Sequence, residues 1–210
     1  MFSFTTSPVA VRSDLTETFV GMWAYFAKPG PVFDARQRSA LLETARTTEN
    51  PDGDSKNRLP EHIAELAHTL YHDPAQVDNN LVRTAAGVAG DAATVETIGL
   101  VSMLSAVDGM HRALGVDLEA LPHPIPGSPT GNIAKRLKRR RTHVPMPRGA
   151  IPSALDLVPD VASAWVASFG PLYMTDEQMG YVDFIRSPGL DRAQIELIAA
   201  KTSLINECFY

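Results

Sequence analysis

Cysteine is almost absent from this sequence: Cys208 is the single cysteine in 210 residues. One cysteine excludes an internal disulfide framework and a zinc site built from several cysteines. Any disulfide must therefore form with another chain or a small thiol. Long apolar runs are missing too, because no stretch reaches the roughly 20 residues that a membrane helix needs. The first residues also lack the basic and apolar segments of a secretory signal. We expect a cytoplasmic protein that does not use a membrane.

Positive charge is scarce overall, since the net charge is -5, and this argues against a general nucleic-acid binder. It is concentrated in residues 135–141, where six of seven side chains are basic. Such a run could bind phosphates or an acidic partner. It contains no aromatic residue for base stacking, however, and most such runs are simply solvated. We regard nucleic acid as an unlikely partner.

The sequence has few alternating patterns of the kind that predict strands, whereas apolar residues recur at helical spacing. With 44% hydrophobic residues it can bury a substantial core. Asp14 with Glu17 resembles a capping box, and Asp91 and Gly115 are expected to cap the longest helix. The fold class expected is all-α. Helices are expected from Asp14 to Lys28, Asp34 to Thr48, Pro60 to a stop before Pro74, Ala92 to Leu114, Ser153 to Val166 and Asp191 to Ile205.

Prolines punctuate the stretch after Gly115, at positions 122, 124, 126, 129, 145, 147 and 152. Proline at this density is typical of a linker or of a segment that wraps a surface. The basic run lies in the middle of this stretch. Residues 116–152 are therefore predicted to be a proline-rich and basic linker.

The final 19 residues, from Arg192 to Tyr210, resemble the core motif of the alkylhydroperoxidase D-like family, also called carboxymuconolactone decarboxylase-like. That motif has an arginine and a glutamate on a helix, a serine and an asparagine near its end, then Cys-x-Tyr/His-Cys and a later histidine. The residues in register are Glu196, Ser203, Asn206, Cys208 and Tyr210. The second cysteine and the histidine would follow Tyr210, so this copy is expected to be cut inside its motif.

An earlier stretch, 95–115, resembles a later helix of the same family, with His111 in place of an asparagine. A shift of 156 positions also hints at a tandem repeat, pairing Arg36, Leu41, Leu42, Thr47 and Asn50 with Arg192, Leu197, Ile198, Ser203 and Asn206. In that register Ala40, Asp52 and Ser55 replace Glu196, Cys208 and the second cysteine. We expect a degenerate repeat over 1–115, the linker over 116–152, and the start of a second repeat over 153–210.

The resemblance implies an alkylhydroperoxidase D-like helical bundle, with Cys208, Glu196 and Tyr210 as the catalytic residues. In the family a glutamate, a tyrosine or histidine, and the distal histidine form a relay that deprotonates a cysteine. Glu196 precedes Cys208 by 12 residues, about 18 Å of rise on an unbroken helix, so the chain must turn back for contact. The implied activity is that of a thiol peroxidase or disulfide oxidoreductase, impaired by the missing residues.

The implied partners are a peroxide, a thiol or disulfide reductant, and further copies of the chain in a homo-oligomer. No cofactor or metal is expected, although His68 and His72 share a helix face and could form half of a metal site. The alternative function is a non-catalytic helical subunit or oligomerisation module of the same fold. Decarboxylation of a lactone is a third reading, and it rests on the family name alone.

Overall fold

The structure is a computed structural model, and it describes residues 2–48, 59–147, 151–186 and 189–207. Helices account for 59% of these described residues, which confirms the all-α class. The α-helices are α1 (Ser13–Phe26), α2 (Ala35–Arg46), α3 (Glu61–His72), α4 (Asn79–Ala89), α5 (Asp91–Leu114), α6 (Pro159–Leu172), α7 (Asp176–Met179) and α8 (Arg192–Ile205). The 3-10 turns are Pro74–Gln76 and Ile151–Leu155, and β1 (Ile185–Arg186) pairs antiparallel with β2 (Leu190–Asp191).

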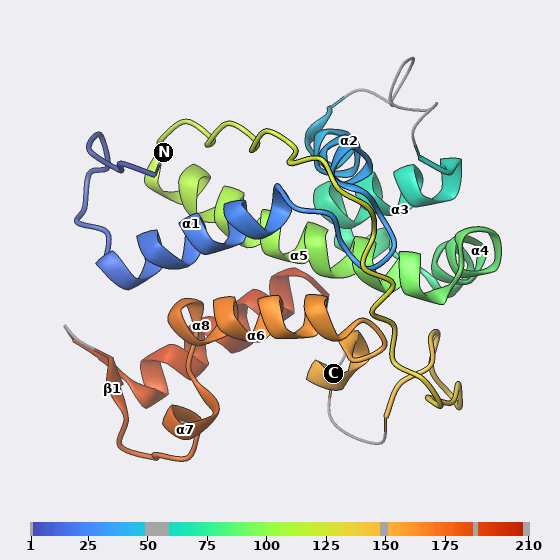
Figure 1. The fold of residues 1–210 in the computed structure, drawn as a ribbon. Coiled ribbons are helices and arrows are strands. Elements are labelled where there is room, and N and C mark those ends of the chain that lie inside the picture. The colour runs from blue at the N-terminus through green and yellow to red at the C-terminus, as the bar shows by residue number, and fades with distance from the viewer. Residues whose placement is uncertain (1, 49–58, 148–150, 187–188, 208–210) are drawn as a thin grey trace.

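The long helix α5 is the centre of the N-terminal half, with α1, α2, α3 and α4 around it (Figure 1). Its residues Leu100, Leu104 and Val107 are fully buried, and they belong to the same core cluster as Phe19 of α1 and Leu41 of α2. Burying apolar side chains of this size stabilises the fold by about 1.5–3 kcal/mol each. The N-terminal half therefore has a core of its own.

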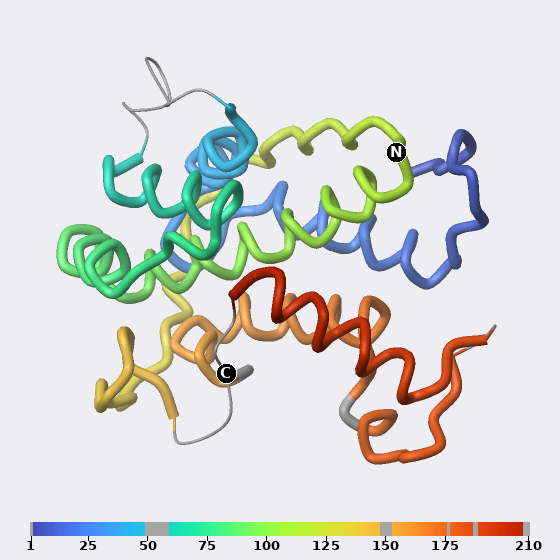
Figure 2. Tube along the Cα trace, turned by 180° about the vertical axis from the view of Figure 1, so that it is seen from behind, coloured from blue at the N-terminus to red at the C-terminus, as the bar shows by residue number. Residues whose placement is uncertain are grey.

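The C-terminal helices form a second layer below this core. Helix α6 packs against α1 and α5, and α8 lies behind α6 in Figure 1 and in front of it in Figure 2. The contact with α5 is close because Gly99 has no side chain: a Cβ there would lie 2.1 Å from Val161 Cγ1. Val161 belongs to a smaller core cluster with Val95, Leu157 and Val158.

The proline-rich segment after α5 runs back over the N-terminal half as an extended strap, seen in yellow-green in Figure 1. Backbone groups tie it down: Ile125 N donates to Ala27 O at 2.7 Å, and Thr130 N donates to Gly30 O at 2.8 Å. The indole Nε1 of Trp23 donates to Ala120 O at 2.7 Å. Residues 120–130 are thus held along the turn between α1 and α2.

Several helix ends differ from the sequence prediction. Arg12 is the N-cap of α1 and Gly90 that of α5, so Asp14 and Asp91 lie in the first turns and do not cap their helices. Both carboxylates pair instead with an arginine, from Arg12 and Arg139 respectively. The prediction for Gly115 is confirmed, because this residue ends α5 in the left-handed conformation with φ 65°.

The helix expected from Ser153 to Val166 is replaced by a 3-10 turn and by α6, which starts at Pro159 and continues to Leu172. Proline suits the first helical turn, because its missing N–H would be unpaired there in any case. Helix α4 and the short β1–β2 hairpin were not predicted at all.

Two helices start in the same way. Asp34 caps α2 and Asp191 caps α8, each in a reciprocal capping box, with Gln37 and Gln194 at the third helical position. Asp191 lies 157 positions after Asp34, so these caps match one residue away from the register of 156 proposed from sequence. The tandem repeat itself stays a prediction.

Candidate functional site

Glu196 is the sequence-predicted site residue that the structure describes, and it lies in the second turn of α8. Arg192, one turn earlier, donates from Nε to Glu196 Oε1 at 2.7 Å. The hydroxyl of Tyr173 donates to the other oxygen, Oε2, at 2.9 Å. Both carboxylate oxygens are thereby held in place, while the side chain keeps 45% exposure. Glu196 is a positioned, solvent-accessible carboxylate.

Three segments that are distant in sequence build this cluster. The Asp191 capping box fixes the start of α8, and Arg192 Nη1 donates to Met179 O at 3.0 Å, which ties α8 to the end of α7. Tyr173 follows the last turn of α6. Burial, and next the hydrogen bond to Glu196, raise the pKa of Tyr173 above its usual value. The phenol therefore stays protonated near neutral pH and acts as a donor.

Cys208 and Tyr210 lie outside the described residues, so their convergence with Glu196 stays a prediction. Helix α8 is unbroken from Arg192 to Ile205, which puts about 13.5 Å of rise between Glu196 and Ile205. The helix ends at Ile205, and Glu207, two residues later, has a left-handed φ of 53°. A change of direction thus falls immediately before Cys208.

A cleft of about 570 Å³ lies between α6 and α8, beside the Glu196 cluster. Tyr173 belongs to both, because its side chain lines the cleft and bonds to Glu196. Apolar side chains make most of the wall, and two arginines stand among them. The lining residues are Arg12, Phe169, Leu172, Tyr173, Arg186, Leu190, Ile195, Ile198, Ala199 and Thr202.

No pattern in the sequence pointed to the two arginines of the cleft or to the role of Tyr173. Arg12 precedes α1 and Arg186 lies in β1, so 174 positions separate residues that meet in one wall. No spacing rule links positions so far apart.

The N-terminal half contains a comparable but buried cluster. Arg38 Nε donates to Glu96 Oε1 at 2.7 Å, and Arg38 Nη2 donates to the Tyr25 hydroxyl at 2.9 Å. Both charged side chains have no exposure. Ala40, proposed as the counterpart of Glu196, is also buried, whereas Asp52 and Ser55 fall outside the described ranges. This cluster is closed to substrate and is structural.

The histidines of α3 do not form a metal site in the described part of the chain, where no group of three or more His, Cys, Asp or Glu could hold an ion. The rings of His68 and His72 lie 4.5 Å apart. Burial, and next the charge of His72, lower the pKa of His68. His111 Nδ1 donates to Val107 O at 2.8 Å, and the ring packs against Phe2 and Phe4.

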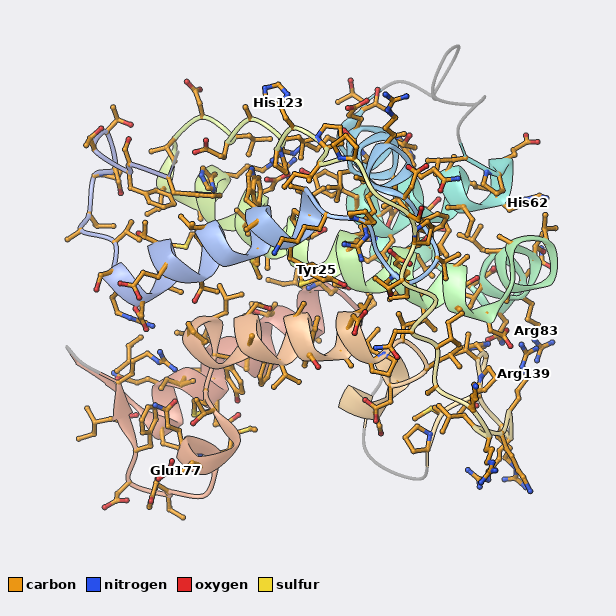
Figure 3. The ribbon with its side chains drawn as sticks, in the orientation of Figure 1. Tyr25, His62, Arg83, His123, Arg139 and Glu177 are labelled. Carbon is orange, nitrogen blue, oxygen red and sulfur yellow. The ribbon has the colours of Figure 1, made fainter. Side chains whose placement is uncertain are left out.

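The basic run forms an exposed loop (Figure 3). Arg139 pairs with Asp91, and Leu137 packs on the smaller core cluster. The remaining basic side chains of 135–141 are exposed to solvent, as a solvated surface run would be.

Helix α8 carries apolar side chains that this chain leaves uncovered. Leu197, Ile198, Leu204 and Ile205 are 71%, 55%, 69% and 68% exposed, whereas Ile195 is buried. Contiguous exposed apolar side chains usually mark an interaction surface.

Among the described residues, no helix has the length and apolar character needed to cross a membrane. The chain matches no family model, no curated protein and no solved structure.

Proposed function

We propose that this chain is an alkylhydroperoxidase D-like thiol peroxidase in which Cys208 is the thiol that reacts. The proposal rests on the motif residues of the last helix, and one observation carries it: Glu196 is held by Arg192 and Tyr173 at the edge of a cleft. A carboxylate that is fixed yet exposed is the kind of group that accepts a proton in catalysis.

The reaction is a two-electron reduction of a hydroperoxide. The Cys208 thiolate attacks the distal peroxide oxygen, the O–O bond breaks, and the products are a sulfenic acid and an alkoxide that takes up a proton to become an alcohol. A small thiol then displaces water from the sulfenic acid and forms a mixed disulfide. A second thiol releases the Cys208 thiolate and leaves as part of a disulfide. Turnover is slow because both thiols come from solution.

Glu196 is proposed as the end of the relay that accepts the thiol proton. Since α8 separates the two groups by more than a helical turn, the proton must pass through an intermediate group or water. Tyr173 and Arg192 are positioning residues in this scheme, because they hold the carboxylate in place without touching the reacting atoms.

The test is peroxide consumption at pH 7 in the presence of a small thiol. Cys208→Ser should abolish the protein-dependent rate, and Glu196→Gln should reduce it by about tenfold or more, as loss of a catalytic base does. Glu17→Gln is the matched control, an exposed glutamate on α1, and should retain the full rate. Unchanged turnover in Cys208→Ser would refute thiol-based catalysis.

A second candidate function, a helical assembly subunit, is favoured by the outer side of α8. Ala193, Leu197, Ala200 and Leu204 are spaced by 4, 3 and 4 residues and are all exposed. At 100° per residue they form one stripe, on the side opposite the residues that line the cleft. Helices with this spacing pack against one another along the stripe. We therefore propose that copies of the chain associate through α8.

Light scattering after size exclusion, over a range of protein concentrations, tests this proposal. Wild type should show a mass above that of one chain, and the double variant Leu197→Glu/Leu204→Glu should be monomeric. Val88→Glu, a change of an exposed valine on α4, is the control and should leave the mass unchanged. A wild type that stays monomeric at all concentrations would contradict association through α8.

A further inference from the structure

The cleft between α6 and α8 has apolar walls along most of its length. Leu172 and Phe169 come from α6, and Ile195, Ile198 and Ala199 come from α8. Its volume of about 570 Å³ lies within the range of small-molecule sites, about 300–1,000 Å³. The walls can therefore enclose an apolar chain or ring.

Two guanidinium groups converge at one place in this cleft. Arg12 Nη2 and Arg186 Nη1 both donate to Pro171 O, at 2.9 and 3.4 Å. Arg186 Nη2 also donates to Gly170 O at 3.3 Å and to Tyr173 O. The Gly170 and Pro171 carbonyls belong to the last turn of α6, whose backbone acceptors are not all used within the helix, and Tyr173 directly follows it. The arginines are thus held side by side by uncharged oxygens.

Charge is not balanced at this point. Arg12 pairs with Asp14, whose side chain is 52% exposed, whereas the hydrogen bonds of Arg186 in the described part of the chain go to carbonyl oxygens. Asp14 acts on Arg186 without forming an ion pair with it in that part of the chain. Burial, and next the positive charge of Arg12, lower the pKa of Arg186. Two neighbouring cations with one exposed carboxylate between them leave an excess positive charge beside an apolar wall.

The excess positive charge and the apolar walls of the cleft together favour one class of ligand. A carboxylate accepts strong hydrogen bonds from charged donors, and each guanidinium keeps one nitrogen, Arg12 Nη1 and Arg186 Nε, without a partner among the hydrogen bonds of the described residues. The two oxygens of one carboxylate can therefore accept from one arginine each. Apolar walls favour a ligand that brings its own apolar surface. A fully polar anion would leave the apolar walls in contact with water, and a neutral lipid would leave the positive charge of the arginines unpaired.

We propose that this cleft binds a small amphipathic carboxylate, with its apolar tail between α6 and α8 and its carboxylate against Arg12 and Arg186. The site shares Tyr173 with the neighbouring Glu196 cluster, but it holds its ligand with other residues, and it goes beyond the thiol chemistry proposed for Cys208. It also lies on the opposite side of α8 from the proposed association stripe, so a bound ligand and a second copy can be accommodated together.

Titration calorimetry of the full chain with hexanoate, octanoate and decanoate tests the inference. Affinity should rise about fourfold for each CH₂ added, as expected for burial of a methylene group. Octanol, which lacks the charge, should bind at least tenfold more weakly than octanoate. Equal affinities of octanol and octanoate would overturn the role of the arginines. Octyl phosphate binding more than tenfold more tightly than octanoate would overturn the carboxylate assignment.

Variants locate the ligand. Arg186→Gln should weaken octanoate about tenfold, the weight of one hydrogen bond between charged groups, and Arg83→Gln on α4 should have no effect. Arg186 also bonds to the end of α6, so its replacement can disturb the fold as well as the contact with the ligand. A second variant, Ala199→Trp, leaves Arg186 in place and fills the cleft, and it should abolish octanoate binding. Val166→Trp, at an exposed position of α6, is its control and should bind normally.

Three further results would overturn the proposal. The first is octanoate binding that survives Ala199→Trp. The second is binding that weakens as the protein concentration rises, because a second copy then fills the cleft. The third is the absence of binding to the folded wild type at millimolar octanoate. Cys208→Ser should bind octanoate as wild type does. Failure of the peroxidase proposal would therefore leave this result unchanged, and the two can be judged separately.

Discussion

Gly30 is the residue whose replacement tests the packing of the N-terminal half most severely. It is buried in the turn between α1 and α2, facing the Arg38–Glu96 ion pair. A Cβ at this position would lie 1.9 Å from Glu96 Oε1 and 2.2 Å from Arg38 Nη2. Real contacts of this kind do not occur, so Gly30→Ala must move the turn or separate the pair.

Either movement breaks polar contacts that are shielded from water. Glu96 Oε2 accepts from Val32 N at 2.8 Å, and Gly30 O accepts from Thr130 N of the strap at 2.8 Å. Breaking a buried ion pair costs about 3–5 kcal/mol, because each charge is left uncompensated. Since domains of ordinary stability have about 5–15 kcal/mol, Gly30→Ala should remove a large part of the free energy of unfolding.

Urea denaturation followed by circular dichroism measures the effect. With a slope of about 2–3 kcal/mol per molar urea, the midpoint should fall by about 1–2 M. The control is Gly109→Ala on α5, where an added Cβ meets nothing within 4 Å. That change should stabilise the protein by up to about 1 kcal/mol, because alanine favours a helix more than glycine does. Equal midpoints for Gly30→Ala and wild type would refute the reasoning.

Three other outcomes are expected. The hydroxyl of Tyr71 donates to Asp108, and burial, followed by this hydrogen bond, raises the pKa of Tyr71 to about 12. The unfolded chain therefore loses the phenol proton at lower pH than the folded chain does, and the free energy of unfolding should fall between about pH 10 and 12. Tyr71→Phe should lessen that fall and cost about 1–3 kcal/mol in denaturation at pH 7. The pKa of His68 is lowered, so the unfolded chain binds its proton first, and stability should decrease below about pH 6.5, less steeply in His68→Gln. Glu196→Gln should raise the apparent pKa of Cys208 in thiol alkylation if it belongs to the relay, whereas a lowered pKa would indicate direct repulsion.

Helices with a strong local sequence signal were predicted well. The apolar spacing around α2, α3, α5 and α8 and the glycine after α5 are visible within one or two turns of chain, so they could be identified from sequence. Capping was less predictable. Asp14 and Asp91 resemble N-caps, but each is taken up by an arginine, and for Asp91 that arginine comes from a loop 48 positions later.

Contacts between distant segments could not be predicted in the same way. Arg38 looks like a surface residue of an amphipathic helix, yet it is fully buried because Glu96 on α5 accepts from it. The cleft likewise depends on how α6 and α8 lie against the residues before α1. For the candidate site, sequence could nominate Glu196 through the family motif, but Tyr173 became visible only with the fold.

The most direct test of the central claim is the rate at which Cys208 forms a sulfenic acid. The chain has one cysteine, so a mass increase after peroxide and dimedone reports this residue alone. The folded protein at pH 7 should react with an organic hydroperoxide at least tenfold faster than the same chain unfolded in urea, where the thiol has an ordinary environment. Equal rates in the folded and unfolded chains would contradict a peroxidase site at Cys208.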